Sequence, residues 1–341
     1  MWVTWRDAMQ NALYGDGGFY QRERPNRHFR TSVHASPAFA HALALVACQV
    51  DDALGHPPVM DLVDIGSGDG LLAIGVLGAV PPDLAARLRV TAVDLSSRPP
   101  GLDDRIAWTS TPPAEIAGLV VANEWLDNVP LDVAEQTPSG PRLVLVDPAT
   151  GDERLGPVPD PADLAWLERW WPMCSAGASG RAGHRAEIGR PRDEAWASVM
   201  VRLTRGTAIA VDYSHHVDNR PPQGTLTGYR AGSIVPAVPD GSCDITAHVA
   251  LDAVADAGER AAGGTGTVTT RLTTQREALR ALGMRGVRPA LALAHDDPRG
   301  YLRALSRASE EAELIDPSGL GGFGWLSQSV SAGRPEPRPR R

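Results

Sequence analysis

Short apolar segments alternate with helix-length segments from residue 59 onward. The first segments of this pattern are VMDLVDI at 59–65, GLLAIGVLGAV at 70–80, RLRVTAVDL at 87–95, RIAW at 105–108 and AGLVVAN at 117–123. Such alternation indicates βαβ units, in which successive strands lie parallel and helices cover the sheet. GTAIAVDY at 206–213 predicts a further buried strand. The sequence therefore predicts an α/β fold with a doubly wound, mainly parallel sheet of the Rossmann-like type.

Other parts of the chain fall outside this alternation. Residues 1–55 predict an N-terminal helical extension, because they contain the long helical pattern PAFAHALALVACQVDDAL. Residues 56–330 predict the main domain, interrupted at about 130–190 by an inserted cap region with two strands and a helix. GFGWLSQSV at 322–330 predicts a returning edge strand, and the Pro- and Arg-rich residues 331–341 predict a disordered basic tail.

The composition narrows the function classes. A formal net charge of -8 argues against non-specific binding of nucleic acid, because that binding needs surplus cations. The chain contains no lysine, which excludes Schiff-base chemistry and a P-loop lysine. Cys48, Cys174 and Cys243 are far apart and form no disulfide or metal pattern. Since apolar stretches also fall short of the roughly 18 residues of a membrane span, we expect a soluble, cytoplasmic protein without membrane insertion.

The sharpest motif is the segment DIGSGDG at 64–70, which lies between an apolar strand and an apolar helix. Glycines at alternate positions let the chain turn tightly and bring backbone N–H groups close to a ligand. The dinucleotide fingerprint is G-x-G-x-x-G, whereas this chain has G-x-G-x-G preceded by an acid. That pattern favours S-adenosylmethionine over NAD, because the methionine end carries an ammonium and a sulfonium instead of a pyrophosphate. The predicted cofactor-binding residues are Asp64, Gly66, Ser67, Gly68 and Gly70.

Asp94 gives a second, independent signal. It ends the next strand, VTAVDL, 24 positions after Gly70, where a carboxylate that binds ribose hydroxyls is expected. The alternative is that the glycines form only a tight turn and that Asp94 caps the following segment. We add Asp94 to the predicted cofactor site.

A third polar cluster, NEWLDNVP at 123–130, follows another predicted strand. In open parallel sheets, ligands bind outside the carboxyl ends of the strands, so these groups would face the site. Glu124 and Asp127 are candidates to hold or deprotonate an acceptor, Asn123 to orient it, and Trp125 to wall the pocket. Helix capping by Asn123 with Trp125 in the core is an almost equally good interpretation.

Taken together, the chain resembles the MidA family of S-adenosylmethionine-dependent methyltransferases. The similar stretches are ALYGDGGFY at 12–20, FRTSVHASPAFA at 29–40, VDIGSGDG at 63–70, NEWLDNVP at 123–130, IAVDYSHH at 209–216, GTLTGYR at 224–230 and DITAHVALDAV at 244–254. The resemblance implies a class I methyltransferase fold, S-adenosyl-L-methionine as cofactor, and Thr31 and Ser32 as further cofactor-binding residues. It also implies a protein substrate, namely an arginine of a respiratory complex I-type subunit.

The chain departs from the family pattern in two places. Where the family usually has Gly-Asp-Phe-x-Thr-Ser-Pro, residues 27–33 read RHFRTSV, which removes an acid and a proline near the expected cover of the active site. Where it usually has Glu-Phe-Phe-Asp-Ala-Leu-Pro, residues 124–130 read EWLDNVP. The cofactor assignment survives these changes, whereas the acceptor assignment is weakened.

Other polar residues give weaker signals. His215 and His216 point to opposite faces of a strand and have no further ligand cluster, so we predict no metal. His248 lines the pocket or lies beside a helix cap. Trp166, Trp170 and Trp171 fall at helical spacing and more often pack an insertion than form a binding site.

Alternative functions remain open at this point. A non-catalytic assembly factor or chaperone would retain the fold without turnover, and a small-molecule methyltransferase would share the cofactor site. An NAD-dependent dehydrogenase is disfavoured by the glycine spacing. A homodimer is compatible with the sequence, which does not fix the oligomeric state.

Overall fold

The computed structural model describes residues 1–22, 31–173, 182–264 and 266–331. The larger sheet has the strand order β16-β17-β10-β5-β2-β3-β4. Its parallel strands are β2 (Met60–Ile65), β3 (Leu88–Val93), β4 (Ile106–Thr109), β5 (Ile116–Asn123) and β10 (Leu203–Asp212). Antiparallel to these, β17 (Gly324–Ser331) and β16 (Thr267–Thr274) extend the sheet beyond β10.

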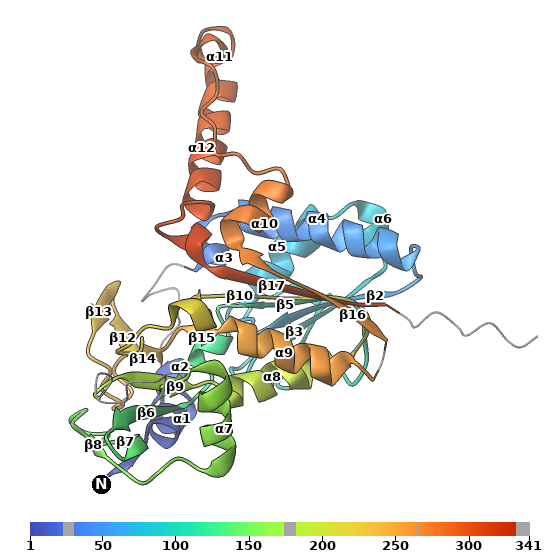
Figure 1. Ribbon diagram of the computed structural model, residues 1–341. Coiled ribbons are helices and arrows are strands. Elements are labelled where there is room, and N and C mark those ends of the chain that lie inside the picture. Colours follow the sequence, from blue (N-terminus) through green and yellow to red (C-terminus); the bar gives the residue numbers. More distant parts are fainter. Residues whose placement is uncertain (23–30, 174–181, 265, 332–341) are drawn as a thin grey trace, which may run out of the picture.

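Helices cover both faces of this sheet (Figure 1). On one face lie α4 (Pro37–Leu54), α5 (Leu71–Ala79), α6 (Pro82–Ala85) and α10 (Gln275–Ala281), and on the other lie α8 (Arg190–Met200) and α9 (Leu251–Ala262). On β5, Leu119 and Val121 pack on the α4 side, whereas Val120 packs on the α8 side. Strands buried on both faces are expected to be almost continuously apolar. The predicted doubly wound α/β fold is confirmed.

A second, antiparallel sheet lies beyond the carboxyl ends of the parallel strands (Figure 1). It contains β1 (Val3–Thr4), β7 (Gly140–Val146), β6 (Asp132–Thr137), β9 (Arg185–Ile188) and β8 (Glu153–Leu155). The helix α1 (Trp5–Tyr14) packs on it through Trp5, Met9 and Leu13, and α7 (Pro161–Trp170) lies against β9. The N-terminal segment therefore contributes to both layers, α1 to this sheet and α4 to the larger one. The domain boundaries at 55 and 330 stay predictions.

Short elements connect these layers. They are α2 (Phe19–Arg22), α3 (Ser32–Ala35), η2 (Leu126–Asn128), β11 (Ser214–His215), η4 (Val217–Asn219), β12 (Thr227–Arg230), β13 (Ser233–Val235), β14 (Asp244–Thr246), β15 (Val249–Ala250) and η5 (Leu320–Gly322). β12 pairs with β13 and β14, and β11 pairs with β15. None of the helices among the described residues combines the length and the apolar character that a membrane span requires.

One strand prediction was wrong. The final strand, β17, lies between β10 and β16 and is hydrogen-bonded to both, so β16 forms the edge of the sheet. The interior position has a physical cause, because Trp325, Leu326 and Val330 are buried and need cover on both sides. Most of the predicted tail, residues 332–341, lies outside the described residues, as do Cys174 and residues 27–30 of the altered family motif.

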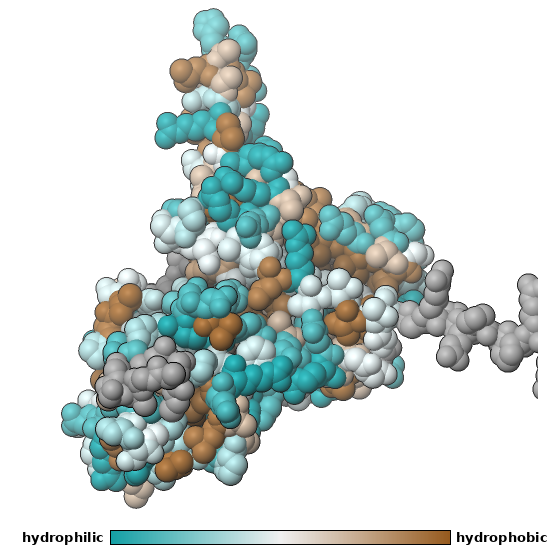
Figure 2. Space-filling model, viewed as in Figure 1, coloured by the Kyte–Doolittle hydropathy of each residue, from teal (hydrophilic) through white to brown (hydrophobic). Residues whose placement is uncertain are grey.

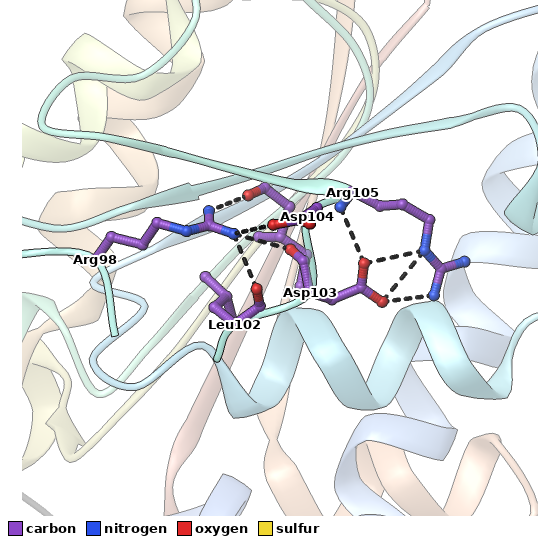
Figure 3. Close-up of polar contacts among 6 residues, drawn as sticks. Arg98, Leu102, Asp103, Asp104 and Arg105 are labelled. Carbon is purple, nitrogen blue, oxygen red and sulfur yellow. Dashed lines mark hydrogen bonds and ion pairs between the residues drawn. The ribbon is translucent and has the colours of Figure 1, made fainter. Parts of the chain in front are cut away.

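Arg98 and Arg105 make polar contacts within the loop between β3 and β4 (Figure 3). The Arg98 guanidinium donates to the carbonyl oxygens of Leu102 and Asp103 at 3.0 and 3.1 Å, and to that of Ile106 at 2.5 Å. Arg105 pairs with the Asp103 carboxylate at 2.6 Å. These contacts fix the shape of the loop that follows the carboxyl end of β3.

A row of glycines crosses the middle of the larger sheet. Gly118 of β5 is paired with Asp61 of β2 on one side and with Gly206 of β10 on the other. A Cβ atom at Gly118 would lie 2.0 Å from the backbone oxygen of Asp61, and one at Gly206 would lie 2.0 Å from the backbone oxygen of Gly118. Only glycine permits this approach of the three strands.

We expect Gly118→Ala to lower the free energy of unfolding by roughly 2 to 4 kcal/mol, because the added methyl group forces the central strands apart. The matched control is Gly78→Ala on α5, where an added Cβ meets nothing within 4 Å. That change should raise stability by about 0.5 to 1 kcal/mol, because glycine is costly within a helix. Urea denaturation measures both, and equal effects of the two substitutions would contradict the proposed constraint.

Candidate functional site

A cavity of about 500 Å³ lies at the carboxyl ends of β2, β3 and β5. The predicted site residues that line it are Thr31, Asp64, Gly66, Ser67, Gly68, Asp94, Asn123 and Glu124. Trp125, predicted to wall the pocket, is also in the lining. The structure thus brings together segments that are far apart in the sequence, from the N-terminal segment to the end of β5. Ser32, Gly70 and Asp127 are not part of this lining.

The glycine turn after β2 has the conformation that the motif predicts. Gly66, Gly68 and Gly70 all have positive φ, at 69°, 60° and 80°. A Cβ at Gly66 would lie 2.8 Å from a ring carbon of Trp125, and one at Gly70 would lie 2.7 Å from a methyl carbon of Leu102. Gly66 therefore leaves room beside the indole at the cavity wall. Gly70 serves the packing of the turn against the β3–β4 loop.

Asp64 is buried at the tip of β2. Its Oδ2 accepts a hydrogen bond of 2.6 Å from the Ser67 hydroxyl. Burial raises the pKa of Asp64 to about 7, in spite of this bond, and the nearby Asp94 contributes to the same shift. A positively charged ligand group beside Asp64 would lower this pKa and be held by the ionised carboxylate.

Asp94 joins the tip of β3 to the glycine turn. Its Oδ2 accepts from the backbone N–H of Gly68 at 2.8 Å, and its Oδ1 accepts from that of Ser96 at 2.8 Å. An ionised carboxylate has about four lone-pair sites, so both oxygens retain capacity for the hydroxyls of a sugar. Ser96 and Ser110 line the neighbouring wall of the cavity. Sequence reasoning missed these serines, because isolated serines in loops carry no distinctive spacing.

Glu124 occupies an unusual backbone position at the end of β5. Its φ is 49°, a left-handed conformation that is uncommon for residues other than glycine. Its backbone N–H donates to the carbonyl of Val211 at 2.8 Å, and its Oε1 accepts from the Ser32 N–H at 2.9 Å and from Asn123 Nδ2 at 3.1 Å. These bonds fix the carboxylate. Ser32 thus contacts a cavity residue, Glu124, although it does not line the cavity itself.

Two acceptor atoms of this cluster are left without a hydrogen-bond partner among the described residues. They are Glu124 Oε2 and Asn123 Oδ1, and both are shielded from solvent. Burial raises the pKa of Glu124 to about 8. Unpaired buried acceptors are costly, so a ligand that brings hydrogen-bond donors to this point would be stabilised.

Asp127 lies deeper than predicted. Its Oδ2 accepts a hydrogen bond of 2.6 Å from Thr246, and its backbone N–H donates to Asp212 Oδ2 at 3.2 Å. Burial raises the pKa of Asp127. Since the side chain faces Thr246 and not the cavity, Asp127 supports the segment that carries Glu124.

The buried guanidinium of Arg192 holds the segment that follows Glu124 through hydrogen bonds to backbone oxygens. It donates to the backbone oxygen of Asp127, to that of Val129 at 3.2 Å, and to those of Ala247 and His248 at 2.8 and 3.0 Å. Its donors therefore go to carbonyl groups, while its charge lowers the pKa of Asp127 and Asp212 and offsets only part of the effect of burial. Sequence reasoning missed Arg192, because an arginine in the first turn of a helix usually lies at the surface.

Carboxyl groups outnumber cations at this edge of the sheet. Burial raises the pKa of Asp212 well above its ordinary value, and it raises that of Asp244 to about 8. Burial raises the pKa of Asp64, Glu124 and Asp127 as well, and Asp127 and Asp212 lie near the buried Arg192 guanidinium. Because burial is the largest cause of each shift, a cationic ligand close to these acids would lower their pKa values and favour the ionised carboxylates.

Aromatic side chains form the N-terminal wall of the cavity. Tyr14 and Tyr20 are stacked with ring centroids 5.5 Å apart. The Tyr20 hydroxyl donates to Asp244 at 2.9 Å, and Tyr14 donates to the backbone oxygen of Asn128 at 3.2 Å. The segment ALYGDGGFY contains both tyrosines, so the resemblance to the MidA family pointed to the segment without assigning it to the site.

His34 ties the N-terminal segment to the glycine turn. Its Nε2 lies 2.9 Å from Asp69 Oδ2, and its Nδ1 lies 2.7 Å from Thr31 Oγ1. All three residues line the cavity. The short helix α3 is thereby held over the turn, which places Thr31 beside the predicted cofactor site.

The remaining histidine and tryptophan candidates have packing roles. His215 Nδ1 accepts from Arg220 at 2.7 Å, and its ring lies edge-on to Trp171 at 4.7 Å. Trp166 is buried and donates to Asp193 at 2.7 Å. The His248 ring stacks on Tyr213 at 5.5 Å and does not line the cavity. Among the described residues no cluster of His, Cys, Asp and Glu has the arrangement of a metal site.

A family model matches residues 42–269, which is more than half of the chain, and it is described as "Putative S-adenosyl-L-methionine-dependent methyltransferase". The chain belongs to this family. A Burkholderia thailandensis protein whose crystal structure contains S-adenosyl-homocysteine is similar, with 26% identity and a TM-score of 0.77. That match covers 97% of this chain and 89% of the other. A native crystal structure from the same organism matches with 26% identity, the same coverage and a TM-score of 0.76.

No curated protein sequence matches the chain at a significant level. The family and the structural relatives together define the chain as an S-adenosylmethionine-dependent methyltransferase. The observed site fits this cofactor, because an added Cβ at Gly68 would meet only open space and because buried acceptor oxygens lack donors. The resemblance to the MidA family in particular is confirmed only at this coarser level.

We expect Gly66→Ala to weaken binding of S-adenosylhomocysteine at least about tenfold, or roughly 1.4 kcal/mol, because its Cβ pushes Trp125 into the cavity. Gly140→Ala is the control, since Gly140 also has a positive φ, of 107°, but an added Cβ there meets nothing within 4 Å. Isothermal titration calorimetry measures both affinities. Unchanged affinity in the folded Gly66→Ala variant would place the ligand elsewhere.

Proposed function

We propose that this methyltransferase transfers a methyl group to a nitrogen of a cationic acceptor, specifically the guanidinium of an arginine side chain in a protein. The observation that carries the proposal is the excess of buried carboxyl groups around Glu124, together with the unpaired Glu124 Oε2 and Asn123 Oδ1. A guanidinium has five N–H donors in a planar fork and remains charged in proteins. It therefore supplies both the donors and the charge that this site lacks.

The glycine turn and Asp94 are proposed to hold the cofactor. Gly66, Ser67 and Gly68 leave the backbone open to the methionine end, and Asp64 would attract its ammonium. Asp94 would accept the ribose hydroxyls. Thr31, in the lining, and Ser32, through its bond to Glu124, would close the site from the N-terminal side.

Bound S-adenosylmethionine supplies a methyl group on a sulfonium, which is already a strong electrophile. The protein therefore has mainly to align the acceptor nitrogen and exclude water, and such proximity effects are worth up to roughly 7 to 11 kcal/mol. Asn123 would orient the acceptor through Oδ1. Glu124 Oε2 would hold an N–H and take the proton that the nitrogen loses when it gains the methyl group.

Asp127 is proposed as a positioning residue and not as a proton acceptor. Its bonds to Thr246 and Asp212 hold the backbone that follows Glu124. This differs from the sequence-based prediction, in which both acids contact the acceptor. A small-molecule amine or guanidine would satisfy the same charges, so the acceptor screen described next includes small metabolites.

We expect the purified protein, incubated with labelled methyl donor and cell extract, to label a protein on arginine. Mass spectrometry of the digested extract identifies the modified residue. Label found only in small metabolites would refute a protein acceptor, and no transfer to any acceptor, with cofactor bound, would favour a non-catalytic assembly factor.

Glu124→Gln should lower turnover of that acceptor at least about 100-fold, because it removes a general base and a charge partner. Binding of S-adenosylhomocysteine, measured by calorimetry, should change by no more than a small factor, since the substituted amide keeps an oxygen for the Ser32 N–H. Unchanged turnover in this variant would eliminate the proposed role.

The activity should rise with pH. Burial raises the pKa of Glu124 to about 8, and only the deprotonated carboxylate accepts a proton. At saturating donor, kcat/KM for the acceptor should therefore rise with a midpoint at about pH 8 or somewhat below, because positive charge close to Glu124 favours its ionised form, and it should level off above that midpoint. This rise of kcat/KM with pH should be absent from the residual activity of Glu124→Gln. A profile identical in both proteins would assign the ionisation to another group.

A further inference from the structure

The methionine end of S-adenosylmethionine carries a carboxylate as well as an ammonium. The charged residues that line the cofactor cavity are mainly acids, among them Asp64, Asp94 and Glu124. Acids attract the ammonium and the sulfonium but repel the carboxylate, because like charges at close range raise the energy of the complex. The carboxylate therefore needs a cation or hydrogen-bond donors from another part of the cavity wall.

The glycine turn leaves space for the methionine end but offers few donors to it. The backbone N–H groups of Gly66 and Ser67 donate to the carbonyl oxygen of Val93 at 2.9 and 3.2 Å. The N–H group of Gly68 donates to Asp94 Oδ2 at 2.8 Å. These three groups already have acceptors within the protein, so they are not free to hold a carboxylate.

Side-chain donors around the turn are engaged in the same way. The Ser67 hydroxyl donates to Asp64, and the Tyr14 and Tyr20 hydroxyls donate to other oxygens of the protein. The two ring nitrogens of His34 lie 2.7 and 2.9 Å from side-chain oxygens. A hydroxyl or a ring nitrogen has at most one proton to donate, so none of these groups has a donor left for the cofactor.

Arg22 differs from these residues. It ends α2, is exposed to solvent and lines the cavity. Toward the described residues its guanidinium, which has five N–H donors, makes one hydrogen bond, from Nη2 to the backbone oxygen of Gly241 at 2.7 Å. It is the one arginine that the described residues contribute to the lining, and the chain contains no lysine. Arg22 thus combines a permanent positive charge with unused donors.

Arg22 also lies on the wall that faces the methionine end. It follows Tyr20 by two residues, and Tyr20 stacks on Tyr14 with ring centroids 5.5 Å apart. Burial raises the pKa of Tyr14, and Asp94 is among the carboxylates that add to this shift, so the tyrosine wall lies close to the end of β3. Asp64 is buried. A carboxylate on the same carbon atom as the ammonium therefore lies toward the open side of the cavity, where the exposed Arg22 is.

We propose that Arg22 binds the carboxylate of the cofactor through charge-assisted hydrogen bonds, and that it makes the enzyme select donors that keep this carboxylate. Decarboxylated S-adenosylmethionine, which has the same sulfonium and the same sugar, is then a poor substrate. The proposal rests on the proposed placement of the cofactor in this cavity. It is independent of the group that accepts the methyl.

Calorimetry with two ligands tests the proposal. They are S-adenosylhomocysteine and decarboxylated S-adenosylhomocysteine, in which a hydrogen atom replaces the carboxylate. We expect the unmodified chain to bind the first at least about tenfold more tightly, because hydrogen bonds between charged groups are the strong ones. In Arg22→Ala the two affinities should lie within about threefold of each other. Its affinity for the decarboxylated ligand should equal that of the unmodified chain, which shows that the variant is folded.

The matched control is Arg299→Ala, which removes the same charge far from the cavity. Arg299 is exposed on α12 (Pro298–Leu314), which together with α11 (Leu291–Asp296) forms an arm that projects from the body of the molecule (Figure 1). Figure 2 shows this arm standing clear of the body. No residue of either helix lines the cavity, so both affinities should stay unchanged in this variant.

A further variant separates this proposal from the placement of the cofactor. Asp94→Asn should weaken both ligands equally, because both keep the ribose. If it weakens neither, the cofactor lies elsewhere and both proposals fail. If it weakens both while Arg22→Ala leaves the preference for the carboxylate unchanged, the placement stands and the role of Arg22 is overturned. An Arg22→Ala variant that changes only the KM of the acceptor would assign Arg22 to an acidic group of the acceptor and would also overturn it.

Discussion

The parallel arrangement of β2, β3, β5 and β10 is the constraint on which the site depends. Parallel strands end at one edge of the sheet, so the polar residue that terminates each strand is brought to the same place. Here most of those terminal residues are acids. The pKa values of Asp64, Glu124 and Asp212 are raised mainly by burial, and nearby carboxylates add to each shift, Asp127 in the case of Glu124. Positive charge bound at this edge, such as the sulfonium of the cofactor, would favour the ionised carboxylates.

Buried residues behind the cavity hold these strand ends in place. Arg192 binds backbone carbonyls on two segments, and Asp212 accepts the backbone N–H groups of Leu126 and Asp127. These bonds hold the segment that follows Glu124 and so fix its left-handed backbone, while the Ser32 N–H holds its carboxylate. The charges are placed by bonds that leave one oxygen of Glu124 available. This explains how a strained position persists beside the cavity.

Sequence reasoning identified the residues at the strand ends, because the period of apolar segments predicts the strands and the glycine spacing predicts the turn. It failed for features that depend on long-range packing. Arg192 and His34 acquire their roles only when distant segments meet, and the interior position of β17 follows from pairing on both sides. Asp127 shows the limit most clearly, since its side chain bonds to Thr246 although Glu124, Trp125 and Asn128 on either side of it line the cavity.

The central claim is that the carboxyl edge of the sheet holds S-adenosylmethionine with Glu124 facing the transferred methyl group. A crystal structure of the complex with S-adenosylhomocysteine tests it most directly. The account predicts the ribose hydroxyls on Asp94, the amino-acid end along Asp64 and Gly66, and Glu124 Oε2 on the acceptor side of the sulfur. A ligand bound elsewhere, or a sulfur turned away from Glu124, would contradict it.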